Sequence, residues 1–307
     1  MKKIIKYLKN PKLIIIYLMN KNFFSFLSDE LYLKWKYRLI FEKKLNLESP
    51  QTFNEKLQWL KLYDRNPKYT QMVDKYEAKE YAKKIIGEKY IIKTLGIYNT
   101  YDEINFDILP DKFVIKPTHT SGNVYLCKNK SQINHKELKH KIRKWLKRDY
   151  YKIHREWPYK NVKPRIIIEE YIEDKKSKNL KDYKFFVFNG KFVYSLVCSD
   201  REESLKFTFF DNNGKFMNFT QDECPNDPNV SKPKKYDKMI ELAEKLAKDI
   251  PEVRVDFYER DNDIYFGELT FFDSAGFGKF EPEEWDLKIG NMLVLPQKEK
   301  SKDEKVK

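Results

Sequence analysis

Two acidic residues near the C-terminal end of the sequence could bind a magnesium ion together. Two β-prone runs flank a turn centred on Asn262, and this register places Asp256 opposite Glu268. It also pairs Arg254 with Thr270, so that the four side chains share one face of the hairpin. Directly paired carboxylates repel each other, and a hard divalent cation removes that repulsion by binding both. The alternative is a solvated hairpin face on which Arg254 bridges the two acids.

A second set of residues could hold phosphate. The apolar run 113–115 ends in Lys116 and leads into the hydroxyl-rich stretch 118–123, which contains the single glycine Gly122. Backbone N–H groups and hydroxyls of such a loop can bind phosphate, and Lys116 adds a positive charge. The spacing matches neither the P-loop nor the dinucleotide fingerprint. A strand that ends in a lysine and a polar turn is also common without any function.

A third pattern would suit a nucleotide base. The apolar run that begins at Ile166 leads into Glu169, Glu170 and Glu173. A base needs backbone hydrogen bonds from an extended segment, and a nearby acid can contact the ribose. The same pattern also fits an ordinary strand end.

The elements that would position these residues are helices first and then mostly strands. Helical spacing predicts helices at 1–72, 74–86, 134–150 and 236–249, and Thr52 with Glu55 predicts a capping box. Strands are expected at 90–92, 113–115, 165–172, 183–188, 191–198, 253–258 and 264–271, with a further pair around 211–214 and the strongest turn at Asn189-Gly190. This order indicates an α+β protein built around antiparallel sheets.

The composition favours a soluble, cytoplasmic protein with a sizeable core. The chain has 307 residues, 41% of them hydrophobic, which is enough for one large domain or two to three closely packed subdomains. Cys127, Cys198 and Cys224 show no CxxC spacing, which argues for a reducing compartment and against disulfides or structural zinc. The apolar run 13–18 is about one third of what a bilayer crossing needs, and no other run approaches that length.

The net charge of +14 comes mainly from lysines spread along the chain, so nucleic acid is an unlikely partner. The N-terminal region is different, because lysines alternate with apolar residues over 2–9 and aromatic residues follow at 23–27. This region could form an amphipathic helix on the inner face of a membrane. It could equally cap the core of a soluble protein.

Taken in order, these pieces resemble the ATP-grasp superfamily, and specifically the TupA-like group linked to bacterial surface-polysaccharide synthesis. The resemblance spans roughly residues 50 to 290 and is carried by the stretches 53–60, 155–160, 182–186 and 267–271. It implies two antiparallel-sheet subdomains at 111–296 that sandwich a nucleotide. A helical N-terminal region with a pre-ATP-grasp subdomain would occupy 1–110, and a disordered charged tail 297–307.

The resemblance also implies roles for individual residues. Lys75 and Lys116 would contact phosphate, and Arg254 and Lys116 would serve in catalysis. Further nucleotide contacts would come from the loop and the linker that holds adenine: Ser121, Gly122, Asn123, Glu170, Tyr171, Ile172, Glu173 or Asp174, and Lys184. Asp256 and Glu268 would bind Mg²⁺. The family usually places an asparagine where this chain has Thr270, so either Thr270 or Asp273 would complete the metal site.

The activity implied is that of an ATP- and Mg²⁺-dependent ligase that joins a carboxylate to an amine through an acyl phosphate. By resemblance, the carboxylate would belong to a sugar acid or a peptide-like component of a capsule, lipopolysaccharide or teichuronic-type polysaccharide. The amine would be an amino acid or an amino alcohol. Arg155, Trp157 and Tyr159 are candidates for the acceptor pocket, although a solvated arginine and a buried tryptophan would fit the same stretch.

Two other functions remain open at the level of sequence. A glycosyltransferase would use Asp261-Asn262-Asp263 as a DxD motif that holds the metal of a nucleotide sugar, yet these are also ordinary turn residues. A basic module that binds membranes or nucleic acid would instead show salt-sensitive binding that does not depend on Asp256.

Overall fold

The structure is a computed structural model that describes residues 11–173, 181–199 and 204–298. The predicted helix over 2–9, the candidate ribose contact Asp174 and nearly all of the predicted charged tail therefore lie outside the described residues. Within the described parts, no helix combines the length and the apolar character that a membrane crossing requires.

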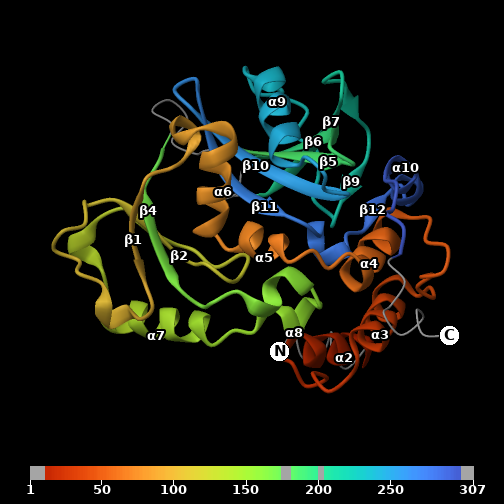
Figure 1. Ribbon diagram of the computed structural model, residues 1–307, viewed down its shortest axis with the longest axis horizontal. Helices are drawn as coiled ribbons and strands as arrows, with labels where there is room; N and C mark the ends of the chain where they lie inside the picture. The colour runs from red at the N-terminus through yellow and green to blue at the C-terminus, as the bar shows by residue number, and fades with distance from the viewer. Residues whose placement is uncertain (1–10, 174–180, 200–203, 299–307) are drawn as a thin grey trace.

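Two antiparallel sheets dominate the fold, as the sequence predicts (Figure 1). The larger is six-stranded, in the order β11-β10-β5-β6-β7-β8. Its strands are β5 (Asp182–Phe188), β6 (Lys191–Ser199), β7 (Lys206–Asp211), β8 (Phe216–Met217), β10 (Glu252–Arg260) and β11 (Asp263–Thr270). The smaller is four-stranded, in the order β1-β4-β2-β3, and consists of β1 (Thr94–Tyr98), β2 (Phe113–Pro117), β3 (Tyr125–Cys127) and β4 (Ile166–Glu170). A two-stranded sheet pairs β9 (Thr220–Gln221) with β12 (Phe280–Glu281).

Helices flank the two sheets, with α2 to α6 before the first strand in the chain and α7 to α10 between or after the strands. They are α2 (Pro11–Asn20), α3 (Asp29–Phe41), α4 (Phe53–Tyr63), α5 (Lys68–Val73), α6 (Glu77–Ile86), α7 (His135–Leu146), α8 (Tyr150–His154), α9 (Tyr236–Leu246) and α10 (Glu284–Met292). Short 3-10 helices are η1 (Glu88–Tyr90), η2 (Tyr101–Glu103), η3 (Lys130–Gln132), η4 (Trp157–Asn161) and η5 (Asp273–Gly276). The predicted capping box is confirmed, because the Thr52 hydroxyl accepts from the backbone of Glu55 at the start of α4 and Glu55 caps in return.

The strand predicted at 90–92 is wrong. Residues 88–90 form η1, and Ile91 makes only an isolated bridge to Phe266. The edge strand of the smaller sheet is instead β1, which pairs with β4 more than sixty positions later. The helix predicted over 134–150 is also two helices, α7 and α8, separated at 147–149. β1 precedes residue 110, so the smaller sheet takes one strand from the region that the sequence analysis assigned to the N-terminal part.

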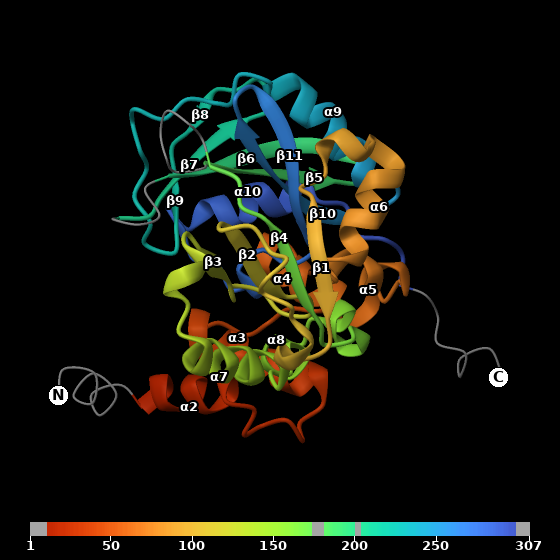
Figure 2. The same cartoon turned by 90° about the vertical axis from the view of Figure 1, so that its left-hand side faces the viewer.

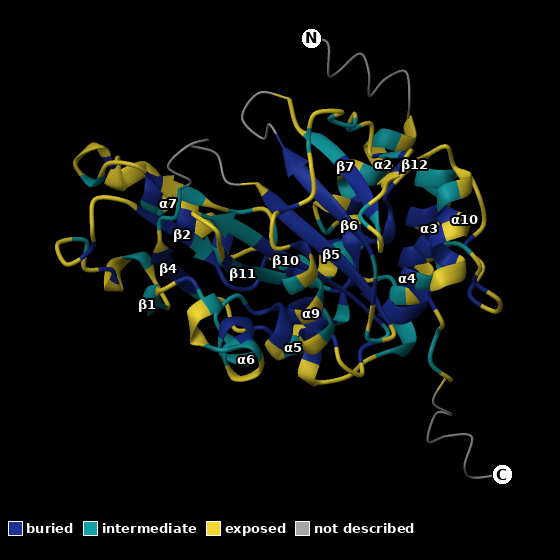
Figure 3. Ribbon diagram, turned by 90° about the horizontal axis from the view of Figure 1, so that it is seen from above, coloured by how far each residue is buried: buried dark blue, intermediate teal, exposed yellow. Residues whose placement is uncertain are grey.

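Alternation along the strands divides each sheet into a core face and a cleft face. In the smaller sheet, Phe113, Ile115 and Ile168 pack on α7 in a separate hydrophobic core, while Val114, Lys116 and Glu169 face the opposite way. In the larger sheet, Phe185 and Phe257 lie 5.8 Å apart by ring centroid, and Phe185 also contacts Tyr236 of α9. The strands of this sheet are buried along most of their length (Figure 3). The remaining face carries the polar side chains of the site.

Candidate active site

The two cleft faces enclose a cavity of about 700 Å³. It is large enough for a nucleotide. Most of the residues that the sequence analysis assigned to nucleotide, metal or catalysis line it: Lys75, Lys116, Ser121, Gly122, Asn123, Glu170, Tyr171, Ile172, Lys184, Arg254, Asp256 and Glu268. Three do not. Glu173 is half-buried and pairs with Lys112 at 2.6 Å, and Thr270 and Asp273 both contact Arg254 without lining the cavity.

The sequence analysis missed the apolar wall of this cavity. Ile92, Val114, Val124, Leu126 and Tyr258 line it together with the polar groups. An apolar wall next to the extended backbone of residues 170–172 suits a flat base, because the faces of the ring need contact and its edge needs backbone hydrogen bonds. Val114 and Leu126 stand directly opposite each other in the β2–β3 pair, so the apolar residues of these two strands indicated part of this wall.

The predicted register of the C-terminal hairpin is confirmed. Asp256 pairs with Glu268 and Arg254 pairs with Thr270. A β-bulge follows, because Phe257 pairs with Phe266 and leaves Gly267 as the extra residue. A Cβ at Gly267 would lie 3.0 Å from the Tyr258 ring and 3.1 Å from the Asp256 carbonyl oxygen. Glycine at this position therefore lets the two strands approach closely next to the acids.

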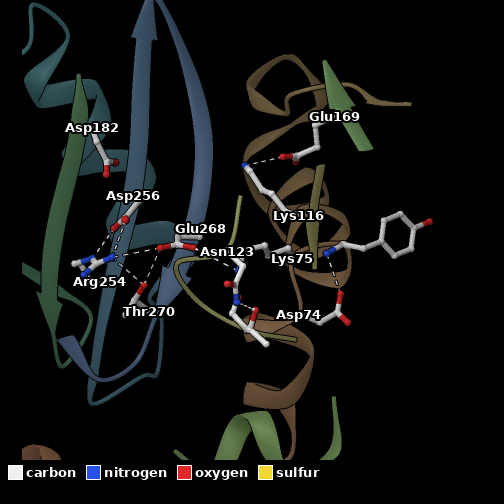
Figure 4. Close-up of polar contacts among 12 residues, drawn as sticks. Asp74, Lys75, Lys116, Asn123, Glu169, Asp182, Arg254, Asp256, Glu268 and Thr270 are labelled. Atoms are coloured by element: carbon white, nitrogen blue, oxygen red, sulfur yellow. Dashed lines mark hydrogen bonds and ion pairs between the residues drawn. The ribbon is translucent and has the colours of Figure 1, made fainter. Parts of the chain in front are cut away.

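Arg254 lies between the acidic groups (Figure 4). Its Nε and Nη2 donate to the two oxygens of Asp256 at 2.7 and 2.8 Å, and Nη2 also reaches Thr270 Oγ1 at 3.1 Å and Glu268 Oε1 at 3.4 Å. Its Nη1 pairs with Asp273. The predicted alternative of an arginine that bridges the acids thus describes this structure, except that the face is buried rather than solvated.

Asp256 is bound by a second cation from the neighbouring strand. Lys184 of β5 pairs directly with Asp256 of β10 in the sheet register, and its ammonium group contacts both Asp256 and Asp182. Burial disfavours the ionised form of Asp256, but the charges of Arg254 and Lys184 outweigh it and hold the pKa of this carboxyl below its ordinary value. Asp256 is therefore a fully ionised, buried counter-ion.

Glu268 has a different environment from its partner. Its side chain is 34% exposed to the cavity, against 2% for Asp256, and its second oxygen lies 4.0 Å from the Lys75 ammonium group. Among the described residues, no cluster of three or more His, Cys, Asp or Glu side chains could hold a metal ion alone. The two paired carboxylates and the Thr270 hydroxyl do suit Mg²⁺, which commonly takes one or two carboxylates and completes its shell with phosphate and water.

The opposite wall of the cavity presents the two lysines (Figure 4). Lys116 lies 2.7 Å from Glu169 Oε2, and Lys79 of α6 lies 2.7 Å from Glu169 Oε1. Burial raises the cost of ionising Glu169, yet the two ammonium groups outweigh it and lower the pKa of Glu169 to about 2. Glu169 is buried and directs Lys116 into the cavity. The sequence analysis named Glu169 only as one of the acids that follow the apolar run and did not identify this role.

The loop over 118–123 is anchored at its base and open at its tip. The Thr118 N–H donates to the Arg165 carbonyl at 2.9 Å, and the Thr118 carbonyl accepts from the Lys75 N–H at 3.1 Å. At the tip, Gly122 has φ of 77°, and no heavy atom would lie within 4 Å of a Cβ there. The tip of the loop at Gly122 therefore borders open space, while the Lys75 ammonium group holds the carbonyl oxygen of Thr120 next to it.

Arg155 is not part of this cavity. Its side chain is 3% exposed, lies 4.4 Å above the Tyr32 ring and donates to the carbonyl oxygens of Phe24 and Leu27 at 3.2 and 3.3 Å. It fixes the N-terminal segment to the body of the protein and is neither solvated nor placed to bind an acceptor. Trp157 and Tyr159 are both half-buried, and their role in an acceptor pocket stays a prediction.

Replacing Glu169 with Gln tests whether Glu169 is the shared counter-ion. The change leaves Lys79 and Lys116 without a buried anion, so we expect the free energy of unfolding to fall by about 3–5 kcal/mol at neutral pH. Since the pKa of Glu169 is lowered from 4.5 to about 2, its contribution is complete above pH 4.5 and is lost as the pH falls toward 2. Urea unfolding at a series of pH values would measure this. Glu170→Gln, a change at the exposed neighbouring residue, is the control. If the difference in the free energy of unfolding between the wild type and Glu169→Gln does not shrink in acid, the assignment is contradicted.

Comparison with known proteins places this geometry in a family. The chain matches the family model TupA-like ATPgrasp over residues 55–294. No curated protein matches the chain in sequence. Among solved structures it is similar to the D-alanine–D-alanine ligase of Bacillus anthracis complexed with ATP, at 13% identity and a TM-score of 0.39 over 73% of this chain and 68% of that one.

Two further solved structures show a similar level of likeness. The ATP-grasp ligase PsnB, complexed with minimal precursor, Mg and ADP, is 12% identical with a TM-score of 0.37 over 70% of this chain and 56% of that one. The ADP complex of PurK, an N5-carboxyaminoimidazole ribonucleotide synthetase, is 13% identical with a TM-score of 0.42 over 78% and 56%. The family match covers well over half of the present sequence and includes both walls of the cavity. The chain therefore belongs to the TupA-like ATP-grasp family and is an ATP-dependent ligase.

Proposed function

We propose that this ligase uses ATP and Mg²⁺ to convert a carboxylate into an acyl phosphate and then joins it to an amine. One observation supports this most directly: Lys75 and Lys116 on one wall of a single cavity face Arg254 and Glu268 on the other. Cations on both sides of a cavity can hold a triphosphate and the charge that develops during phosphoryl transfer.

The first step transfers the γ-phosphoryl group. A carboxylate oxygen of the substrate attacks the γ-phosphorus, the bond from that phosphorus to the β–γ bridging oxygen breaks, and ADP leaves. Lys75, Lys116 and Arg254 would stabilise the negative charge on the phosphoryl oxygens. Asp256, Glu268 and Thr270 would hold the Mg²⁺, which when bound would neutralise phosphate charge. The loop at 121–123 would cover the phosphates and exclude water that would hydrolyse the product.

The second step forms the amide. The nitrogen of a neutral amine attacks the carbonyl carbon of the acyl phosphate, the bond to the phosphate oxygen breaks, and inorganic phosphate leaves with a proton from the nitrogen. On the strength of the family likeness alone, we place the carboxylate on a sugar acid or a peptide-like component of a surface polysaccharide. Glu170, Tyr171 and Ile172 would hold adenine through their backbones. Glu173 stays a candidate for the ribose, although it pairs with Lys112 in this structure.

The rival glycosyltransferase reading has less support. Asp261 and Asn262 adopt φ of 51° and 71° at the tip of the β10–β11 hairpin, which is the left-handed conformation that Asn and Asp favour in tight turns. Neither they nor Asp263 lines the cavity. A turn role accounts for these residues without any metal.

Coupled assays of ADP release test the proposed function. We expect release to require Mg²⁺ and a carboxylate from a panel of uronic acids and short peptides. Hydroxylamine should trap the acyl phosphate as a hydroxamate. With the carboxylate that supports ADP release, an amino acid or ethanolamine should take the place of hydroxylamine and give the amide. Hydroxamate formation without ADP release would contradict the order of steps. Cleavage of a UDP-sugar with no dependence on ATP would support the glycosyltransferase instead.

A further inference from the structure

The N-terminal end of the described chain exposes an unusual number of large apolar side chains. Phe26 is 78% exposed and Phe23 is 66% exposed, and Tyr17 on α2 is 49% exposed. Ile14 and Ile15 add to them on α2, and these five residues are termed the N-terminal apolar surface. α2 lies at the lower edge of the molecule in both Figure 1 and Figure 2, on the opposite side from α9. Large exposed apolar side chains gathered within one short segment are typical of a contact with another apolar phase.

This surface is presented by a segment that is fixed on its inner side. Met19 is fully buried, and its carbonyl accepts from the Tyr32 hydroxyl at 3.3 Å. Arg155 binds the carbonyl oxygens of Phe24 and Leu27, and both of these side chains pack against the main core. Phe23 and Phe26 point outward, and their neighbours Phe24 and Leu27 point inward. The outward aromatic residues are held in place because these neighbours are packed against the core. Of the two readings of this region in the sequence, the core cap describes the inner side of residues 19–27, whereas the amphipathic helix on a membrane stays a prediction.

The charge of the same region indicates what covers it. The first 28 residues contain six lysines and no aspartate or glutamate. Of the two lysines that the structure describes in this segment, Lys12 pairs with Glu42 at 2.7 Å. A second copy of the chain, packed by the same surface, would still bring an excess of lysines to the interface, and like charges would repel. An anionic surface attracts such a segment instead, with each lysine near a charged bilayer contributing to binding.

We propose that the N-terminal apolar surface binds an anionic lipid bilayer. Phe23 and Phe26 enter the interface between headgroups and acyl chains, α2 lies along it, and Lys12 and Lys21 remain among the anionic headgroups. This inference does not depend on the ligase chemistry, because none of these residues lines the cavity between the sheets.

The test is co-sedimentation of the full chain with vesicles. We expect the protein to pellet with vesicles of phosphatidylcholine and phosphatidylglycerol, to pellet weakly with phosphatidylcholine alone, and to be released by high salt. The double variant Phe23→Ser/Phe26→Ser should lower the partition coefficient by about tenfold or more, because two exposed aromatic anchors are lost. Circular dichroism should show that the variant keeps the wild-type fold.

The chain offers a matched control. Ile108 and Val294 are 71% and 68% exposed, close to the values for the two phenylalanines, and lie outside the N-terminal segment. Ile108→Ser/Val294→Ser should bind vesicles as the wild type does. Equal binding by the phenylalanine double variant, or no binding of the wild type to anionic vesicles, would overturn the proposal. A dimer that dissociates in Phe23→Ser/Phe26→Ser without any vesicle binding would show that the surface serves self-association.

Discussion

Replacing Asp256 with Asn is expected to abolish ADP release and also to lower the free energy of unfolding by about 3–5 kcal/mol. Asp256 is 2% exposed and carries both the two-point contact with Arg254 and the contact with Lys184. An asparagine of the same shape keeps the volume but removes the negative charge, so two buried cations lose their shared counter-ion. Urea unfolding and ADP release, measured on the same preparation, would give both values.

The matched substitution lies directly across the hairpin. Glu268→Gln changes the carboxylate that pairs with Asp256 in the hairpin register. This side chain is about one-third exposed, and the cation nearest to it is Arg254, whose Nη2 lies 3.4 Å from Glu268 Oε1. Screening by solvent makes such contacts weak, so we expect the free energy of unfolding to change by no more than about 1 kcal/mol. ADP release should still fall by about 100-fold or more, because the group that faces the triphosphate is lost.

The pair of variants separates two roles that the sequence cannot distinguish. Full turnover in Glu268→Gln would show that Glu268 does not hold the metal. A stable but inactive Asp256→Asn variant would show that Arg254 and Lys184 find other partners, and that Asp256 acts only on the bound nucleotide. If both variants unfold easily, the difference in burial between the two side chains has no energetic consequence.

The hairpin register was predictable because its causes are local. The pairing of Asp256 with Glu268 was predicted from a turn centred on Asn262, and the structure reaches it through two compensating local features. The turn lies at Asp261-Asn262, between paired Arg260 and Asp263, and the bulge at Gly267 shifts the register by one residue, so that Asp256 still faces Glu268. The unequal burial of the two acids was not predictable. It depends on Lys184, which arrives from β5, 72 positions earlier in the chain, and on Asp273 beyond the end of β11.

The errors in the smaller sheet have the same origin. The run at 90–92 has β-prone residues but makes only the isolated bridge of Ile91 to Phe266, whereas β1 pairs along its length with β4. Likewise, Glu169 was visible in the sequence as one of several acids. Its role follows from Lys79 of α6, 90 positions away, and from Lys116 on the adjacent strand. Contacts between distant segments are set by tertiary packing, which a local pattern does not encode.

A buried acid near Arg254 further illustrates this limit. Glu156 is 3% exposed, and within the described residues its Oε1 has no hydrogen-bond partner. Burial raises the pKa of Glu156 to about 7 against the opposing charges of Lys61, Lys36 and Arg254. The sequence analysis counted Glu156 only as part of a family-like stretch. Its proximity to these cations depends on how α3, α4 and η4 pack together.

Lys116→Met should lower kcat/KM for ATP by about 100- to 1000-fold while leaving the fold almost as stable as the wild type. Lys116 lies near the end of β2 on the cleft face, and its ammonium group is 2.7 Å from Glu169 in the cavity that Glu268 and Arg254 also line. Methionine fills similar space but carries no charge, so a cation that stabilises the transferred phosphoryl group is lost. Stability is preserved because Lys79 still neutralises Glu169 at 2.7 Å.

Replacing the anion and replacing the cation of the Lys116–Glu169 ion pair should have different effects, which makes this prediction specific. Glu169→Gln leaves the buried Lys79 and the partly buried Lys116 without their anion and is expected to damage the fold. Lys116→Met leaves the buried Lys79–Glu169 pair intact and is expected to damage only turnover. Lys136→Met, on the exposed side of α7 behind the same sheet, removes a lysine without touching the cavity and should match the wild type in both assays. Retention of normal kcat/KM by Lys116→Met would remove this lysine from the phosphate site. A large loss of stability would instead make Lys116, rather than Lys79, the main counter-ion of Glu169.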